Sequence, residues 1–145
     1  MIGMTATVSF DITSMIDFQE VDNALNQARK EVVQRYDFKM NALWEIVQTR
    51  LVRRSVPIKN FKVPESEPAA GGAVRRVIAI QQGIPIEAAR EIVKFIKDRK
   101  LKKVQAAIQA DQVRVSSPSK DELQEAIQAL REHDFGVALQ FGNYR

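Results

Sequence analysis

The sequence has no cysteine and only one histidine among its 145 residues. Without cysteine there is no disulfide, no thiolate chemistry and no zinc site that needs sulfur ligands, and this composition fits a reducing compartment. The single histidine, His133, lacks the neighbours in sequence that a metal site or an acid–base mechanism requires, so we interpret it as a surface residue. These absences disfavour metal-dependent and nucleophilic catalysis.

Long apolar runs are also missing, since none approaches the roughly 18 residues that a membrane-spanning helix needs. The N-terminus, MIGMTATVSFDIT, has no basic start and no long apolar core, so nothing marks it for secretion. The patterns GxxxxGK[ST], GxGxxG, HExxH and GxSxG do not occur, which removes the standard phosphate loops and common catalytic motifs. We therefore expect a cytoplasmic protein with no membrane segment, no cofactor and no enzymatic activity.

What the sequence does contain is an excess of basic residues, with a formal net charge of +4 and a pI near 9.5. Residues 37–64 carry six basic and two acidic residues, and a second basic cluster runs from Lys94 to Lys103. Positive charge favours anionic partners, although a basic pI is also common in proteins that bind none. The distribution of charge is therefore more informative than its total.

Alternation of apolar and polar residues predicts a strand over residues 7–13. Helical spacing predicts helices from Asp17 to Tyr36, opened by a capping-box spacing of Asp17 and Glu20, and from Met40 to Arg54. A strand is predicted over residues 58–63, and residues 64–72, PESEPAAGG, have the composition of a linker. We expect an N-terminal domain over residues 1–63 and a C-terminal domain over residues 73–145.

Residues 73–145 carry the clearer pattern. A strand at 73–81 precedes a helix with Pro85 at its first position, and a hairpin with strands at 102–109 and 112–116 follows. Ser119 and Glu122 have capping-box spacing before a second helix, and a strand at 137–142 ends the set. The order β-α-β-β-α-β is that of ferredoxin-like domains. The predicted fold class is therefore α+β, with two helices on one face of a four-stranded sheet and the other face open.

Strand alternation gathers amides and an arginine on the predicted open face. Glutamine and arginine side chains can hydrogen-bond the edges of a base, but a water-facing sheet surface has the same composition without a ligand. The absence of an aromatic residue there separates this face from RRM domains, which stack bases on sheet aromatics. The candidates are Gln105, Gln109 and Arg114, together with Gln81 and Gln140.

A basic cluster lies at the end of the preceding predicted helix. Dense positive charge can bind phosphate, although lysines also complement the negative end of a helix dipole. We predict that this cluster and the polar sheet face converge on a single concavity that holds an anion. The candidate phosphate-binding residues are Lys97, Arg99, Lys100, Lys102 and Lys103.

The segment RYDFK, residues 35–39, offers a third candidate site. Tyr36 and Phe38 could stack on a base while Arg35 or Lys39 meets its phosphate. Aromatic residues at such a position more often complete a core.

Five blocks, in this order and across nearly the whole chain, resemble the YajQ family of bacterial nucleotide-binding proteins. They are SFDI at 9–12, RYDFK at 35–39, QQGI at 81–84, KFIKDRKLKKVQAAIQADQVRV at 94–115 and LQFGNYR at 139–145. The resemblance implies a cytosolic protein of two ferredoxin-like domains that exchange their N-terminal strands. It also implies regulatory binding of purine nucleotides, cyclic di-GMP or RNA, with no established catalysis.

The sequence departs from the family at the junction of Lys39 and Met40, where a β-hairpin of about two dozen residues is missing. Either the protein is shorter here or a segment is unrepresented in the sequence, and in both cases the N-terminal ferredoxin-like half is incomplete. Ala110 also stands where the family usually has glycine, and Gly142 where a polar residue is usual.

Three functional hypotheses remain. The leading one is a non-catalytic module that binds a purine nucleotide, cyclic di-GMP or RNA and thereby alters contacts with a protein partner, for example in transcription. The second is a protein–protein interaction adaptor that uses the open sheet face or a sheet edge. The third, an enzyme acting on nucleotides, is the least favoured because no acid–base pair or metal set is evident.

Overall fold

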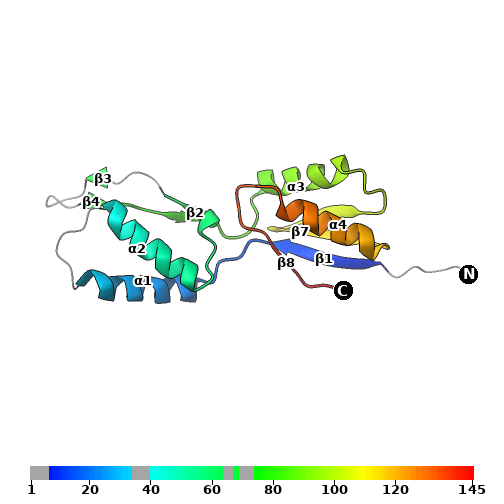
Figure 1. Ribbon diagram of the computed structural model, residues 1–145. Helices are drawn as coiled ribbons and strands as arrows, with labels where there is room; N and C mark the ends of the chain where they lie inside the picture. Colours follow the sequence, from blue (N-terminus) through cyan, green and yellow to red (C-terminus); the bar gives the residue numbers. More distant parts are fainter. Residues whose placement is uncertain (1–6, 34–39, 64–66, 69–73) are drawn as a thin grey trace, which may run out of the picture. The chain divides into compact units, whose positions relative to one another are not determined.

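The computed structural model describes residues 7–33, 40–63, 67–68 and 74–145. The chain divides into two compact units, and Figure 1 colours it from the N-terminus to the C-terminus. Unit 1 comprises Met1–Met15 and Gln82–Arg145, and unit 2 comprises Ile16–Gln81. Helices and antiparallel strands both occur, so the protein is α+β, as the sequence predicts.

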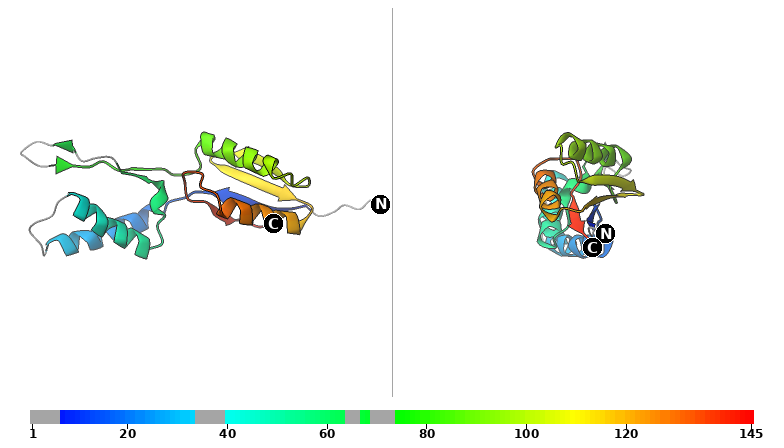
Figure 2. Two further views of the ribbon diagram at one scale, coloured as in Figure 1. Left: turned by 45° about the horizontal axis from the view of Figure 1, so that its top comes forward. Right: turned by 90° about the vertical axis from the view of Figure 1, so that its right-hand side faces the viewer.

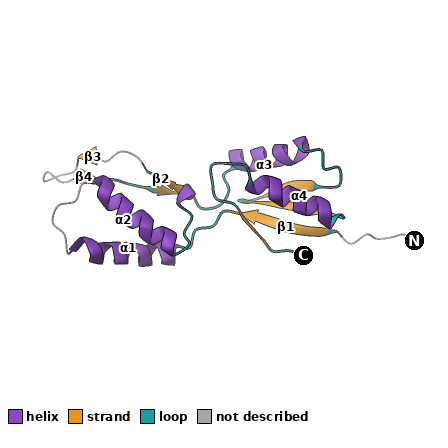
Figure 3. Cartoon of the chain, in the orientation of Figure 1, coloured by secondary structure: helices purple, strands orange, loops and turns teal. Residues whose placement is uncertain are grey.

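Unit 1 is built on a four-stranded antiparallel sheet with the order β6-β7-β1-β8. The N-terminal strand β1 therefore lies between two strands from the far end of the sequence. Figure 3 shows these strands in orange. Along the chain, the elements of unit 1 are β1 (Val8–Thr13), α3 (Ile86–Asp98), β6 (Gln105–Gln109), β7 (Gln112–Ser117), α4 (Lys120–Arg131) and β8 (Gln140–Gly142).

The position of β1 differs from what the local pattern predicts. The pattern predicts that residues 73–81 supply the first strand of the C-terminal sheet, but β1 occupies that position beside β7. The reason is burial: Phe10 and Ile12 of β1 are both 0% exposed, whereas Val77 is 68% exposed. Short strands form instead, as β4 (Val74–Arg75) pairs with β3 (Glu67–Pro68) and β5 (Ala79–Ile80) pairs with β2 (Phe61–Lys62).

The predicted linker at residues 64–72 lies largely outside the described residues and stays a prediction. The division found in the structure falls elsewhere, between residues 15 and 16 and between residues 81 and 82. Unit 2 is therefore a continuous insertion between β1 and α3 of unit 1. The two chain segments of unit 1 meet where the Gly83 N–H donates to the Ser14 carbonyl at 2.7 Å.

Strand alternation gives the sheet of unit 1 one apolar face, and both helices pack on it (Figure 2). Phe10 of β1 and Val113 and Val115 of β7 are fully buried there. Ile92 of α3 and Leu130 of α4 cover them. Burial of each such side chain contributes about 1.5–3 kcal/mol. Neither of these two helices covers the opposite face of the sheet.

The helix starts of unit 1 follow the sequence signals closely. The Ser119 side chain accepts a hydrogen bond from the Glu122 N–H at 3.3 Å, as the capping-box spacing predicts. Pro85 is the N-cap of α3 rather than its first residue, a shift of one position.

Unit 2 is organised around α1 (Phe18–Val33) and α2 (Met40–Arg53), followed by a 3-10 turn at Ile58–Asn60. Its buried core is small. Trp44 of α2 is partly buried and packs against this core. The buried core residues are Ile16, Val21, Ala24, Leu51 and Val56.

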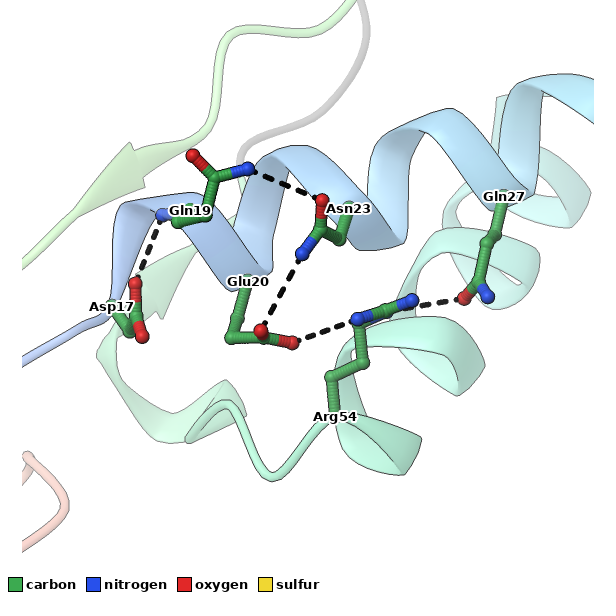
Figure 4. Close-up of polar contacts among 6 residues, drawn as sticks. All are labelled: Asp17, Gln19, Glu20, Asn23, Gln27 and Arg54. Atoms are coloured by element: carbon green, nitrogen blue, oxygen red, sulfur yellow. Dashed lines mark hydrogen bonds and ion pairs between the residues drawn. The ribbon is translucent and has the colours of Figure 1, made fainter.

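Polar contacts join the two helices of unit 2 (Figure 4). Arg54, in the turn directly after α2, contacts Glu20 at 2.9 Å and Gln27 at 3.2 Å, both on α1. Asp17 accepts a hydrogen bond from the Gln19 N–H at 3.0 Å, so it caps α1 as predicted. The carboxylate of Glu20 accepts hydrogen bonds from Arg54 and from the Asn23 amide, and these contacts take the place of the predicted capping-box bond.

Candidate functional site

The open face of the sheet in unit 1 carries the amides and arginine predicted from the sequence. Val113 and Val115 mark the core side of β7, so the residues between them point away from the helices. Gln105, Gln109 and Arg114 therefore share the open face. The paired positions on this face are Gln105 with Ser116, Ala107 with Arg114 and Gln109 with Gln112.

Arg114 is held on this face by Asp11 of β1. Its Nε lies 2.9 Å from Asp11 Oδ1 and its Nη2 lies 3.4 Å from Oδ2, and the Asn143 amide donates to the same carboxylate. The side chain of Asp11 is 6% exposed and that of Arg114 is 34% exposed.

This network also sets the ionisation of its members. Hydrogen bonds from Arg114 and then from Asn143 lower the pKa of Asp11, and burial opposes them. The hydrogen bond and charge of Asp11 raise the pKa of Arg114. The guanidinium is therefore fixed in place, and its charge is partly neutralised before any ligand binds.

The five predicted phosphate-binding cations are all exposed near the end of α3. Lys100 follows the helix with a left-handed φ of 58°, which turns the chain toward β6. The Arg99 guanidinium lies 4.8 Å from the centre of the Phe95 ring, so part of its surface is used in a cation–π contact. Lys102 and Lys103 lie in the exposed turn that leads into β6.

The prediction of a single concavity is wrong for Lys97. This residue lines a groove of about 250 Å³ together with Ile108 of β6. Ile108 is paired with the core-facing Val113, so the groove lies on the helix side of the sheet. Gln105 and Gln109 lie on the other side of the same strand. The edge strand β6 therefore separates the amides from Lys97.

Of the two further glutamines that the pattern placed on the open face, Gln140 lies on that face opposite Thr13, whereas Gln81 does not belong to this sheet. Gln81 belongs to unit 2, where its N–H donates to the Asn60 carbonyl at 2.7 Å. The Gln140 carboxamide contacts Thr13 and both backbone polar groups of Met15. The candidates from the RYDFK segment lie outside the described residues, so their binding role stays a prediction: Arg35, Tyr36 and Phe38.

Two arginines of unit 2 are paired with carboxylates. Arg50 lies 3.1 Å from Glu31 and Arg54 lies 2.9 Å from Glu20. The cavities that these arginines line also contain Glu20 or Glu31. Their positive charge is therefore less available to an anionic ligand than that of the exposed lysines in unit 1.

His133 is exposed, and its ring lies 4.9 Å from that of Phe95 and 4.5 Å from that of Phe135. Among the described residues no three His, Cys, Asp or Glu side chains gather in a way that could hold a metal ion. Within the same ranges no helix combines the length and apolarity needed to cross a lipid bilayer.

The sequence pattern missed Asp11 and Asn143 as members of the polar face. Alternation along SFDIT already places Asp11 on the side opposite to Phe10 and Ile12. The pairing of β1 with β7 and β8 was the missing information, because it joins residues more than a hundred positions apart, as in the Asp11–Arg114 contact with a separation of 103.

A model of the family described as "Nucleotide-binding protein YajQ-like" matches residues 8–42 and 39–145 of this chain. A nucleotide-binding protein of Koribacter versatilis is 46% identical over 159 aligned residues, which cover 94% of this chain and 96% of the relative. Proteins with the same designation from Trichlorobacter lovleyi and Chloroherpeton thalassium are 43% and 40% identical, over 94% and 98% of this chain and 98% and 100% of the relatives.

The alignment also shows where this chain is shorter than its relatives. Since 94% of 145 residues is about 136, roughly 23 of the 159 aligned positions have no residue of this chain opposite them. The two parts of the family match meet at residues 39–42. This is the junction at which the sequence predicts a missing hairpin, and the shortfall is close to its expected length.

Proposed function

This chain belongs to the YajQ-like family of nucleotide-binding proteins, and from that premise we propose that it binds a nucleotide and does not catalyse its conversion. The observation that carries the proposal is the family match, which extends over almost all of the chain. The relatives are named for nucleotide binding and none of them for an enzymatic activity.

The surface of unit 1 supports this proposal chemically. The exposed lysines at the turn into β6 provide positive charge for phosphate oxygens, and each neutralised phosphate adds affinity by releasing counterions. The amides of Gln105 and Gln109 are exposed on the adjacent strand, where they can hydrogen-bond a base edge. Lys102 and Lys103 are the cations nearest in sequence to Gln105.

The ligand class we propose is a purine nucleotide, cyclic di-GMP or single-stranded RNA. Occupancy of the face would change the contacts that unit 1 offers to a protein partner, which gives the protein a regulatory role. We also infer that unit 1 is a ferredoxin-like domain completed by an exchanged N-terminal strand. The element order β1, α3, β6, β7, α4, β8 supports this inference, because it reads β-α-β-β-α-β.

The test is a titration of the purified protein with labelled cyclic di-GMP and with labelled single-stranded RNA at two salt concentrations. The test variant combines Lys102→Glu with Lys103→Glu. The matched control combines Arg29→Glu with Lys30→Glu, which changes the net charge equally at two exposed positions of α1.

We expect the test variant to weaken binding more than the control does. For RNA, the slope of log affinity against log salt should fall by about 0.7 for each phosphate that the variant no longer neutralises. Equal weakening in both variants would show that net charge alone matters. If the parent protein binds neither ligand, the proposed function is wrong.

A second candidate function rests on the exposed edge of the sheet. In the part of the chain that the structure describes, β6 has a sheet neighbour on one side only, and Ile108 on this strand is 37% exposed. An edge strand of this kind can pair with another protein. Co-purification of a protein partner that is abolished by Ile108→Lys, with neither nucleotide ligand binding, would favour this adaptor role.

A further inference from the structure

A cavity of about 320 Å³ in unit 1 lies between the first turns of α4 and the paired backbones of β1 and the C-terminal residues. Its lining includes none of the glutamines, lysines and arginines that were assigned to the polar face above. Val8 and Leu123 give it an apolar floor, and the side chain of Tyr144 contributes an aromatic surface. Ligand pockets typically combine such an apolar lining with a few convergent polar groups. The lining residues are Val8, Ser9, Lys120, Leu123, Gln124, Tyr144 and Arg145.

The backbone beside Tyr144 is fixed in place. The Arg145 N–H donates to the Ser9 carbonyl at 3.0 Å, and the Ser9 N–H donates to the Arg145 carbonyl at 3.1 Å. Asn143 takes a φ of 54° just before this pairing resumes. The Tyr144 ring lies 6.1 Å from that of Phe10, yet the residue is 58% exposed. A positioned tyrosine with this much free surface can stack on a planar ligand.

The α4 side of the cavity supplies two polar groups at matching positions. Lys120 and Gln124 are four residues apart on α4, so they lie on the same side of the helix, and both are exposed. An ammonium group binds phosphate oxygens, and a carboxamide can donate to and accept from the edge of a base.

The charge of the lining favours an anion. Four other cavities formed by described residues each have at least one carboxylate in their lining. The first has Glu31 and Glu45, the second has Glu45, the third has Glu20 and the fourth has Asp98. The lining of the Tyr144 cavity includes Lys120 and Arg145 and no Asp or Glu side chain. It is also the one cavity of these five that has an aromatic residue in its lining.

We infer that the Tyr144 cavity binds a purine nucleoside monophosphate or an equivalent nucleotide unit, with the base stacked on Tyr144. Gln124 meets the edge of the base, and Lys120 meets the phosphate. This site is separate from the polar face assigned above, and its nucleotide specificity rests on the proposed function.

The test uses the full chain and guanosine 5′-monophosphate as the probe, followed by calorimetry and by amide chemical shifts. Tyr144→Ala should weaken binding roughly 5- to 150-fold, which corresponds to the loss of one base stack. Tyr144→Phe is the matched control, because it keeps the ring, and it should bind within about twofold of the parent. Lys120→Gln should weaken binding and reduce its salt dependence.

Chemical shifts keep the inference testable if Tyr144→Ala does not fold. In the parent protein, the amides perturbed by the probe should cluster at residues 120–124 and 144–145. Perturbation confined to β6 and β7, or unchanged binding by a folded Tyr144→Ala, would overturn the inference and leave nucleotide binding at the polar face intact. Failure of the parent to bind guanosine monophosphate, cyclic di-GMP and RNA would overturn both proposals. Equal binding of ribose 5-phosphate would refute stacking.

Discussion

Gly83 offers a sharp test of how the two chain segments of unit 1 are joined. Its φ is +83°, and a Cβ added there would lie 2.5 Å from Asp111 Oδ2 and 2.7 Å from Asp111 Cβ. Its N–H also donates to the Ser14 carbonyl. Alanine at this position would therefore be strained by its backbone conformation and would collide with the hairpin turn between β6 and β7.

The two costs can be estimated separately. A left-handed conformation costs an L-residue about 1–2 kcal/mol, and overpacking against a fixed neighbour costs about 1–3 kcal/mol. We therefore expect Gly83→Ala to lower the free energy of unfolding by about 2–5 kcal/mol. Gly136→Ala is the matched control, since Gly136 has a φ of +86° and nothing within 4 Å of an added Cβ. It should show only the backbone cost.

The assay is urea denaturation followed by far-UV circular dichroism, which reports on both units. Fluorescence of Trp44, the one tryptophan, reports on unit 2 and should change less. Adding Asp111→Gly to Gly83→Ala should recover the steric part of the loss, because the close contacts are all to the Asp111 side chain, at Oδ2, Cβ and Cγ. If Gly83→Ala and Gly136→Ala differ by less than about 0.5 kcal/mol, the predicted collision does not occur.

Three further predictions concern local features of unit 1. Ala110 has a φ of 55° in the hairpin turn, so Ala110→Gly should raise the urea midpoint, with a gain of about 0.5–1 kcal/mol. The pKa of Asp11 is lowered in the folded state, so the stability it contributes is present above its unfolded pKa of 3.8 and is lost as pH falls through its folded pKa. The fall in urea midpoint below about pH 4 should therefore be shallower in Asp11→Asn than in the parent, and an identical pH profile would contradict this explanation. Ser119→Ala removes the cap that accepts from Glu122, and thermal unfolding should show a loss of about 1 kcal/mol; no loss would mean that the cap is replaced by solvent.

Local patterns predicted the elements of unit 1 well because they depend on nearby residues. The hairpin of β6 and β7 and the cap of α4 at Ser119 are present as predicted. Period-two alternation also placed Gln105 and Gln109 on the open face correctly, since it needs no knowledge of strand partners. The family resemblance is confirmed by the comparisons.

Features that depend on distant pairing could not be predicted from patterns. Nothing local in β1 indicates that it lies between β7 and β8, so the contact of Asp11 with Arg114 was missed. Lys97 and Gln105 are close in sequence, yet the edge strand puts them on different sides, because a helix on one face reaches only that face. Tyr144 stands out in the sequence only as part of a motif, and its exposure became evident from the backbone pairing of Arg145 with Ser9.

The central position of β1 has a consequence for how the protein is made. A ribosome that adds about 5–20 residues per second needs roughly 5–20 s to move from the end of β1 at Thr13 to the start of β7 at Gln112. During that interval Phe10 and Ile12 have emerged without the strands that will flank them, and β8 is translated later still. Unit 2, encoded in between, can fold first. The nascent chain therefore carries an apolar strand without its final partners for most of its translation. During this period the exposed strand is a binding site for chaperones.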